Sequence, residues 1–113
     1  MRELEGAWTV DGLVSGDDVS PVPAGVKATI SFEDGRIHVH GGCNSGSADG
    51  WEVDGRTITF GPLVSTLMLC GPDEMAVEHA VFTALGRGEV TYRIDGGAVT
   101  LTNAEGAGLR LRR

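Results

Sequence analysis

The sequence predicts a small, mainly β domain of the α+β class. About eight short antiparallel strands should form a barrel-like sheet, and one helix should pack against this sheet or plug it. Eighteen of the 113 residues are glycine, roughly twice the average share, which suits short strands joined by tight turns. Hydrophobic and polar residues alternate along most of the chain, as in half-buried strands. Only residues 71–88 change to the three-and-four spacing that is typical of a helix.

Length and charge limit what the chain can be. A chain of 113 residues supplies one hydrophobic core, so we expect residues 1–113 to form a single domain. Sixteen acidic and nine basic residues give a formal net charge of -7, which makes nucleic acid and anionic lipid surfaces poor partners. The longest uncharged apolar stretch, residues 61–70, is too short to cross a bilayer. The expected partner is a protein or a small ligand, and a monomer is favoured.

The first half of the chain predicts one strand, one loop and two hairpins. Alternation over residues 4–10 predicts a strand whose even-numbered side chains face the core, and the turn dipeptide Asp11-Gly12 should end it. Two prolines and two adjacent acids predict a long surface loop over residues 12–25. Residues 27–40 and 51–60 each predict a hairpin, because the alternation continues on both sides of an Asp-Gly turn.

A helix and a three-strand meander follow. Pro72 suits the first helical position, while Asp73 and Glu74 suit the positive end of the helix dipole. We expect the helix to end at Gly86 or Gly88. Its apolar face consists of Val77, Ala80, Val81, Ala84 and Leu85. After the helix, alternation interrupted by two glycine-containing turns predicts the strands of the meander.

Three short motifs lie in the middle of the chain. They are Gly42-Cys43-Asn44, Gly61-Pro62-Leu63 and Ser65-Thr66-Leu67-Met68-Leu69-Cys70. In order and spacing they resemble the META-domain family of HslJ-like heat-inducible proteins, and the resemblance continues through Glu78 and Leu85 of the helix into the meander. The chain departs from the family pattern at residues 45–48, which are small where members commonly carry bulky or aromatic side chains. Any surface that those side chains would build is therefore missing.

The resemblance implies a noncatalytic domain in which the residues of the three motifs have structural roles. It also implies a link to bacterial envelope stress and an exported or lipid-anchored location. Residues 1–5 lead into the first strand without the apolar run of a secretory signal. We therefore expect a cytoplasmic location if Met1 is the native start, and an upstream signal or lipid anchor if Met1 begins an excised domain.

The two cysteines, Cys43 and Cys70, both belong to the segments that carry the resemblance. Because the family is usually found in oxidising compartments, the resemblance implies a disulfide between them. In a reducing cytoplasm, the alternative is two buried thiols that behave as small hydrophobic side chains.

His38 and His40 form a metal-like pattern, because two imidazoles two residues apart on one strand can hold a zinc ion. Cys43, Cys70 and His79 are conceivable further ligands. The alternation places both strand histidines on the outward face, where solvated histidines are expected. Since the spacing assigns no third ligand, we expect no metal and no cofactor.

No catalytic residues are expected either. A Cys43 nucleophile with a histidine base lacks an orienting third group. The adjacent acids at residues 17–18 and 73–74 are explained by a polar loop and by the helix dipole. The glycines at residues 41–42 are not followed by the lysine and helix of a phosphate-binding loop, so they predict a chain reversal.

Several polar and aromatic side chains are expected to be structural. Asn44 should bond to neighbouring backbone groups. Ser65 and Thr66 should be buried and bonded to the backbone. Trp8 and Trp51 should belong to the core rather than line a ligand pocket.

These observations favour a noncatalytic META-type binding or structural module, which the resemblance links to the bacterial envelope or the stress response. The alternative is a carrier of a small apolar ligand in the barrel mouth, and an enzyme of unknown class comes third. A carrier needs an apolar cavity that the aromatic side chains leave unfilled, whereas a binding module needs a filled core and an exposed apolar patch. The aromatic side chains concerned are Trp8, Phe32, Trp51, Phe60, Phe82 and Tyr92.

Overall fold

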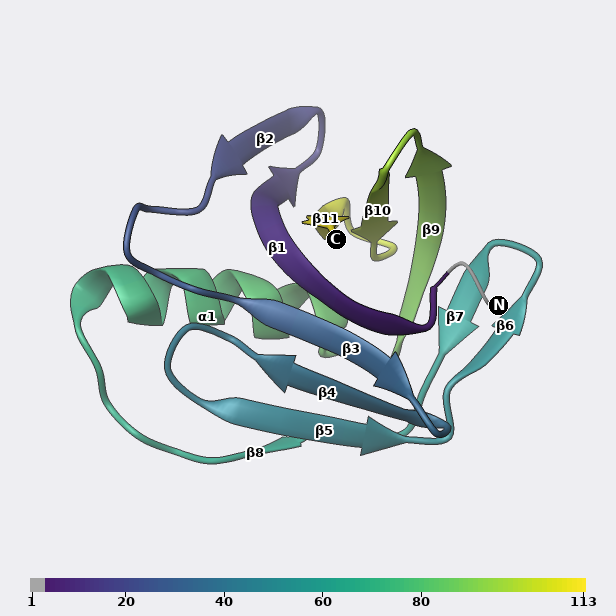
Figure 1. Ribbon diagram of the computed structural model, residues 1–113, viewed down its shortest axis with the longest axis horizontal. Coiled ribbons are helices and arrows are strands. Elements are labelled where there is room, and N and C mark those ends of the chain that lie inside the picture. The colour runs from purple at the N-terminus through teal and green to yellow at the C-terminus, as the bar shows by residue number, and fades with distance from the viewer. Residues whose placement is uncertain (1–3) are drawn as a thin grey trace.

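A computed structural model describes residues 4–113, which form one antiparallel sheet and one helix, α1 (Pro72–Leu85) (Figure 1). The strands are β1 (Gly6–Ser15), β2 (Asp18–Pro21), β3 (Thr29–Glu33), β4 (Arg36–His40), β5 (Ser45–Asp49), β6 (Glu52–Asp54), β7 (Thr57–Thr59), β8 (Val64–Ser65), β9 (Glu89–Asp95), β10 (Ala98–Thr102) and β11 (Ala107–Arg112). Residues 1–3 lie outside the described residues. They belong to the predicted domain and to the segment predicted to lead into its first strand. The predicted mainly β class with one helix is confirmed.

The sheet is an open, curled half-barrel. Its strand order is β6-β7-β9-β10-β11-β1-β3-β4-β5-β8, and β2 pairs with β1 beside this path. The central strand is β1, which pairs with β3 near its start, with β2 near its end and with β11 over most of its length. A register shift between Val10 and Gly12 marks a β-bulge, which bends β1. In Figure 1, β1 accordingly curves between the β3–β5 strands and the meander of β9–β11.

The structure differs from the sequence-based prediction mainly in strand number. It has eleven strands rather than about eight. The predicted loop over residues 12–25 is wrong in its first part, because β1 continues to Ser15 and turns back into β2. The dipeptide Asp11-Gly12 lies within β1 beside the bulge and does not end the strand. Two further strands, β5 and β8, escaped prediction because small residues and a two-residue length leave no periodic signal.

The core lies between the curled sheet and α1, which packs against β1, β9 and β11. The buried residues of the helix are Val77, Glu78, Val81, Ala84 and Leu85. The predicted apolar face is therefore confirmed except at Ala80, which is half-buried. Trp8 is buried, and Trp51 packs edge-on against buried Phe32 with ring centroids 5.3 Å apart, as expected of core tryptophans.

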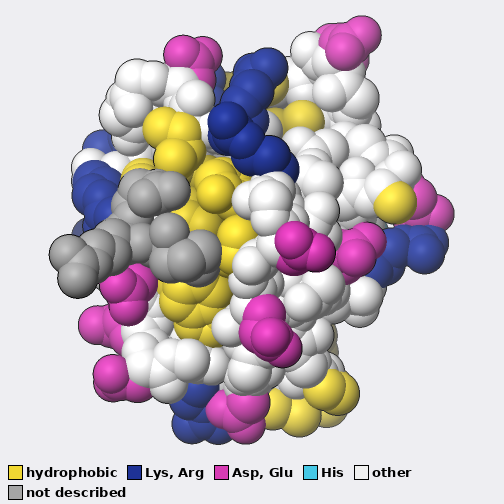
Figure 2. Space-filling view, turned by 90° about the vertical axis from the view of Figure 1, so that its right-hand side faces the viewer, with side chains coloured by type: hydrophobic (Ala, Val, Ile, Leu, Met, Phe, Trp, Pro, Cys, Tyr) yellow, Lys and Arg dark blue, Asp and Glu magenta, His cyan; other side chains and the backbone are white. Residues whose placement is uncertain are grey.

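Figure 2 shows acidic side chains at separate places on the face that lies to the right in Figure 1, around hydrophobic side chains gathered in its middle. The helix α1 has 14 residues, and within residues 4–113 no helix has the length and apolar character needed to cross a membrane.

Candidate functional site

The first and third motifs meet at Asn44, which follows β4 and is only 2% exposed. Its carboxamide oxygen accepts hydrogen bonds from the Met68 backbone N–H at 2.7 Å and from the Thr66 hydroxyl at 2.8 Å. Its carboxamide nitrogen donates to the Met68 carbonyl oxygen at 3.1 Å. One buried side chain thus holds both backbone polar groups of Met68, as a neighbouring strand would.

Glu78 anchors this arrangement to α1. Its side chain is buried, at 8% exposed, and its carboxylate accepts hydrogen bonds from the Asn44 backbone N–H at 2.5 Å and from the Asn44 carboxamide nitrogen at 2.6 Å. No cation pairs with this carboxylate among the described residues, so these two charge-assisted bonds offset its loss of hydration. The contact joins the loop after β4, the segment around Met68 and the helix.

A disulfide closes the same arrangement. Cys43 and Cys70 are bonded to each other, with their Cα atoms 6.0 Å apart. Cys43 is buried and precedes Asn44, while Cys70 lies at the exposed end of the segment just before α1. The disulfide and the side-chain hydrogen bonds of Asn44, together called the clamp here, therefore fix the chain at two nearby points, Met68 and Cys70.

The segment held in this way, residues 63–70, is here called the clamped segment. Its hydrophobic side chains are mostly exposed, and Leu67 and Leu69 reach 94% and 92% exposure. They alternate with Thr66 and Cys70, whose side chains bond to Asn44 and Cys43.

The start of the clamped segment is attached to the sheet. Val64 and Ser65 form β8, which pairs with β5, and the Thr66 N–H donates to the Ser45 carbonyl oxygen at 3.0 Å. Gly46 permits this close pairing, because a Cβ atom there would lie 2.9 Å from the Val64 carbonyl oxygen. The small residues of β5 thus accommodate β8 instead of building a surface of their own.

The Gly61-Pro62-Leu63 motif leads into the clamped segment. The Gly61 N–H donates to the Asp49 carbonyl oxygen at 2.9 Å. Pro62 is exposed, and Leu63 is half-buried and packs against the core. The motif therefore attaches this end of the clamped segment to the body of the domain.

The structure corrects two expectations about single residues. The side chain of Asn44 bonds to residues that lie 22 to 34 positions away, not to neighbouring backbone groups. Ser65 and Thr66 are exposed rather than buried, although the Thr66 hydroxyl does bond to the backbone, accepting from the Ser45 N–H at 3.2 Å. Both errors arise because the partners come together only through the fold.

The role of Glu78 could not be assigned from the chain alone. An acidic residue directly beside Val77, on the buried side of the helix, was the available signal, since buried carboxylates almost always have a partner.

Gly42, in the loop after β4, lies against α1. It has a φ of 106°, and a Cβ atom there would lie 3.2 Å from the Glu74 carbonyl oxygen. The glycine thus allows the close approach of α1 in addition to the predicted chain reversal.

The histidines and acids noted in the sequence lie apart from the clamp. His38 is exposed on β4, the Nδ1 atom of His40 is 3.1 Å from the Ser45 hydroxyl, and His79 is exposed on α1. Cys43 and Cys70 are bonded to each other and offer no thiolate. Within residues 4–113, no group of three or more His, Cys, Asp or Glu side chains is arranged to hold a metal ion. The acids of residues 73–74 occupy the first turn of α1, as predicted.

Comparison with known proteins gives the family. Among curated proteins none matches the chain. An NMR structure of a protein from Burkholderia xenovorans is similar, with a TM-score of 0.77 and 20% identity over 99% of this chain and 84% of that chain. A second NMR structure has a TM-score of 0.71 and 20% identity over 96% of this chain and 89% of that chain. At 20% identity, these two structures show that the fold is shared. The META domain matches residues 2–113, so the chain belongs to the META-domain family.

Proposed function

We propose that this META-domain protein is a noncatalytic binding module that contacts a partner protein through the clamped segment. The observation that carries the proposal is the exposure of Leu67 and Leu69, at 94% and 92%, on a segment held by buried groups. Val64 and Met68 add apolar surface to the same segment. Contiguous exposed apolar side chains of this kind are typical of interaction sites.

The clamp supports this function physically. Binding costs free energy when a loop must be ordered, and a segment that is already fixed avoids most of that cost. Here the carboxamide of Asn44, the disulfide and the β8 pairing hold the backbone on which the leucines stand. Leu67 and Leu69 are separated by one residue and stand on a fixed backbone. They suit a recognition surface in which a few apolar side chains supply most of the affinity.

The state of Cys43 supports the noncatalytic part of the proposal. A cysteine nucleophile must be a free thiolate. The Cys43 sulfur is bonded to Cys70, and the disulfide ties the loop to the clamped segment. The buried polar groups of the site are likewise used within the protein, because Asn44 and Glu78 bond to each other.

The carrier alternative receives less support. Trp8 and Phe32 lie in the core, and the four other aromatic side chains considered above pack against it. This arrangement, together with the exposed leucines, matches what a binding module needs.

We also propose that the protein acts in an oxidising compartment such as the bacterial cell envelope, as the resemblance implies. The disulfide supports this location, because cytosolic thiols are kept reduced. Alkylation of free thiols in intact cells before lysis should leave Cys43 and Cys70 unlabelled, and labelling of both would contradict the location. A role in the stress response is implied by the resemblance alone, and induction of the transcript by heat would test it.

Crosslinking tests the binding function. A photo-crosslinking amino acid placed at position 67 or 69 should give the same protein adduct in cells, and one placed at Val19 should not. Val19 is a suitable control because it is also a partly exposed hydrophobic residue but lies on β2. The same adduct from all three positions would contradict a specific surface.

Affinity for the purified partner then tests the leucines. The variant Leu67→Ser/Leu69→Ser should bind at least about tenfold more weakly than the unchanged chain. Val19→Ser/Ile94→Ser, which changes two exposed hydrophobic residues elsewhere, should bind as the unchanged chain does. Equal affinity of both variants would overturn the proposal.

A further inference from the structure

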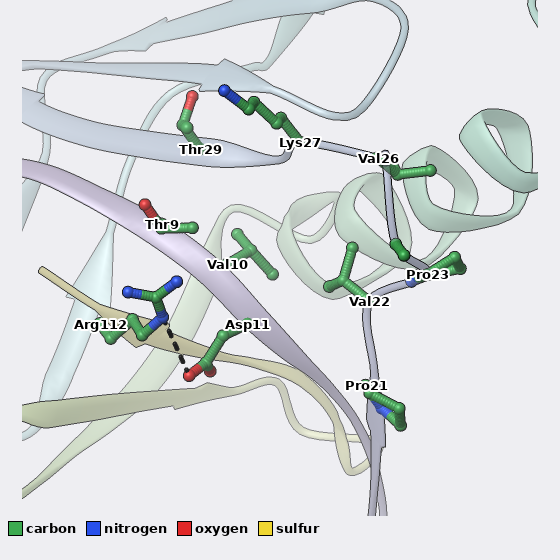
Figure 3. Close-up of a pocket in the computed structure, with 12 residues that line it drawn as sticks. Thr9, Val10, Asp11, Pro21, Val22, Pro23, Val26, Lys27, Thr29 and Arg112 are labelled. Atoms are coloured by element: carbon green, nitrogen blue, oxygen red, sulfur yellow. Dashed lines mark ion pairs between the residues drawn. The ribbon is translucent and has the colours of Figure 1, made fainter.

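A second candidate site lies between β1 and the loop that joins β2 to β3, and none of its lining residues belongs to the clamped segment. A pocket of about 630 Å³ is lined by β1, the start of β3, the end of β11 and the loop between β2 and β3 (Figure 3). This volume is within the usual range for small-molecule sites. The loop of residues 22–28, which joins the end of β2 to the start of β3, forms one wall of the pocket.

One end of this pocket is polar, and strand register explains why. Thr9 of β1 pairs with Arg112 of β11 on one side and with Thr29 of β3 on the other. Directly paired residues point to the same face of a sheet, so these three side chains form a row across three strands. Lys27 lies two residues before Thr29, and Figure 3 shows it beside Thr29, on the same side of the pocket as Thr9 and Arg112.

The opposite end of the pocket is apolar. Val10, Val22 and Val26 line it together with Pro21 and Pro23. Figure 3 shows Val22 and Val26 on the side near α1, away from Lys27 and Thr29. The pocket thus has a cationic, hydroxyl-bearing end and a hydrophobic end.

The local charge is opposite to that of the whole chain. The acid at the pocket, Asp11, accepts a hydrogen bond from Arg110 Nε at 3.0 Å, and its other oxygen lies 3.6 Å from Arg112 Nε. Lys27 forms no ion pair within residues 4–113, and the ion pair of Arg112 is its 3.6 Å contact with Asp11. The charged residues that line the pocket, Lys27, Arg112 and Asp11, carry a net charge of +1, in a chain of net charge -7.

We infer that this pocket binds a small carboxylate with an aliphatic tail. The carboxylate lies between Lys27 and Arg112 and accepts hydrogen bonds from the hydroxyls of Thr9 and Thr29, while the tail packs on the partly buried Val22 and Val26. Neighbouring strands are about 4.8 Å apart, so β11 and β3 are separated by roughly 10 Å. Long lysine and arginine side chains can approach one carboxylate across such a distance, and arginine can contact both of its oxygens. This site is independent of the proposed protein-binding segment.

Titration with octanoate, observed by NMR of the isotopically labelled chain, tests the site. Octanoate is kept below the concentration at which it forms micelles, and octan-1-ol and acetate serve as probes that lack either the charge or the tail. Octanoate should shift the signals of Thr9, Lys27 and Thr29 together with the methyl signals of Val22 and Val26. It should bind at least about tenfold more tightly than either other probe, because only octanoate uses both ends of the pocket.

Charge-removing variants locate the binding. Arg112→Gln and Lys27→Gln should each weaken octanoate binding by about five- to tenfold. This is less than the usual effect of losing a charge-assisted hydrogen bond, because both side chains are exposed to water. The matched control is Arg87→Gln, since Arg87 is an exposed arginine that pairs with Glu105 elsewhere on the surface. Equal weakening by the control variant would show binding by overall charge.

Two further outcomes would also overturn the inference. If octan-1-ol binds as tightly as octanoate, the cationic end has no role. If octanoate shifts none of the named signals, the pocket is not its site. All of these variants lie on the surface, and the unchanged signals of buried residues report that each one folds.

Discussion

The clamp predicts that the substitution Asn44→Ala will both destabilise the domain and release the clamped segment. The alanine removes four side-chain hydrogen bonds: one to the Glu78 carboxylate, two to the backbone of Met68 and one from the Thr66 hydroxyl. The backbone bond from residue 44 to Glu78 remains available. The loss is therefore confined to the carboxamide.

The magnitude follows from the surroundings of each bond. The bond to the buried carboxylate of Glu78 is worth roughly 1.5–3 kcal/mol. The three bonds to Met68 and Thr66 are neutral, and these residues are exposed, so water replaces much of each bond and about 0.5 kcal/mol remains for each. The free energy of unfolding of Asn44→Ala should thus fall by about 3–4 kcal/mol.

Urea denaturation measures this loss, and hydrogen exchange at the Met68 amide measures the release of the segment. The matched control is Asn103→Ala. Asn103 is also buried and also makes four side-chain hydrogen bonds, but these go to the end of α1 and to residues 105 and 107. The control should lose about 2 kcal/mol, because all four of its bonds are neutral. It should leave exchange at Met68 unchanged.

Two results would refute the reasoning. A loss of less than about 1 kcal/mol in Asn44→Ala would mean that the carboxamide bonds contribute little to stability. Unchanged protection of the Met68 amide in Asn44→Ala would mean that the disulfide and the β8 pairing hold the segment without the carboxamide. Both readouts are made with the disulfide intact.

Three further predictions concern the helix, the cysteines and the histidines. Leu85→Ala should lower the free energy of unfolding by about 2–5 kcal/mol, because the side chain is only 1% exposed; a change below about 0.5 kcal/mol in chemical denaturation would contradict this packing. Removing the Cys43–Cys70 bridge should cost about 3–4 kcal/mol through the greater freedom of the unfolded chain, and thiol titration of the unreduced chain in denaturant should find no free thiol. Protein purified without added zinc should contain no stoichiometric metal, and one zinc per chain that is lost in His38→Ala would count against the outward placement of His38 and His40.

The sequence alone was sufficient for the parts of the fold that depend on local pattern. The hairpins of β3–β4 and β6–β7 and the meander of β9–β11 follow from period-two alternation around glycine turns. The helix follows from its proline, its first-turn acids and its three-and-four spacing. These signals lie within a few residues of the element that they specify.

Elements defined by long-range pairing could not be predicted in this way. The strand β8 has two residues, and it exists only because β5 lies beside it. The extension of β1 past Gly12 depends on its partners β2 and β11, which turn an apparent turn dipeptide into part of a bulged strand. In both cases the hydrogen-bonding partner is distant in sequence or carries no pattern of its own.

The candidate site divides in the same way. The motifs were visible in the sequence, and the resemblance implied the pairing of Cys43 with Cys70. The partners of Asn44 were not predictable, because Met68 and Glu78 lie 24 and 34 positions further along the chain. Only the packing of α1 against the loop after β4 brings the three together. The exposure of Leu67 and Leu69 is likewise a property of the tertiary structure, since an apolar run on its own suggests burial.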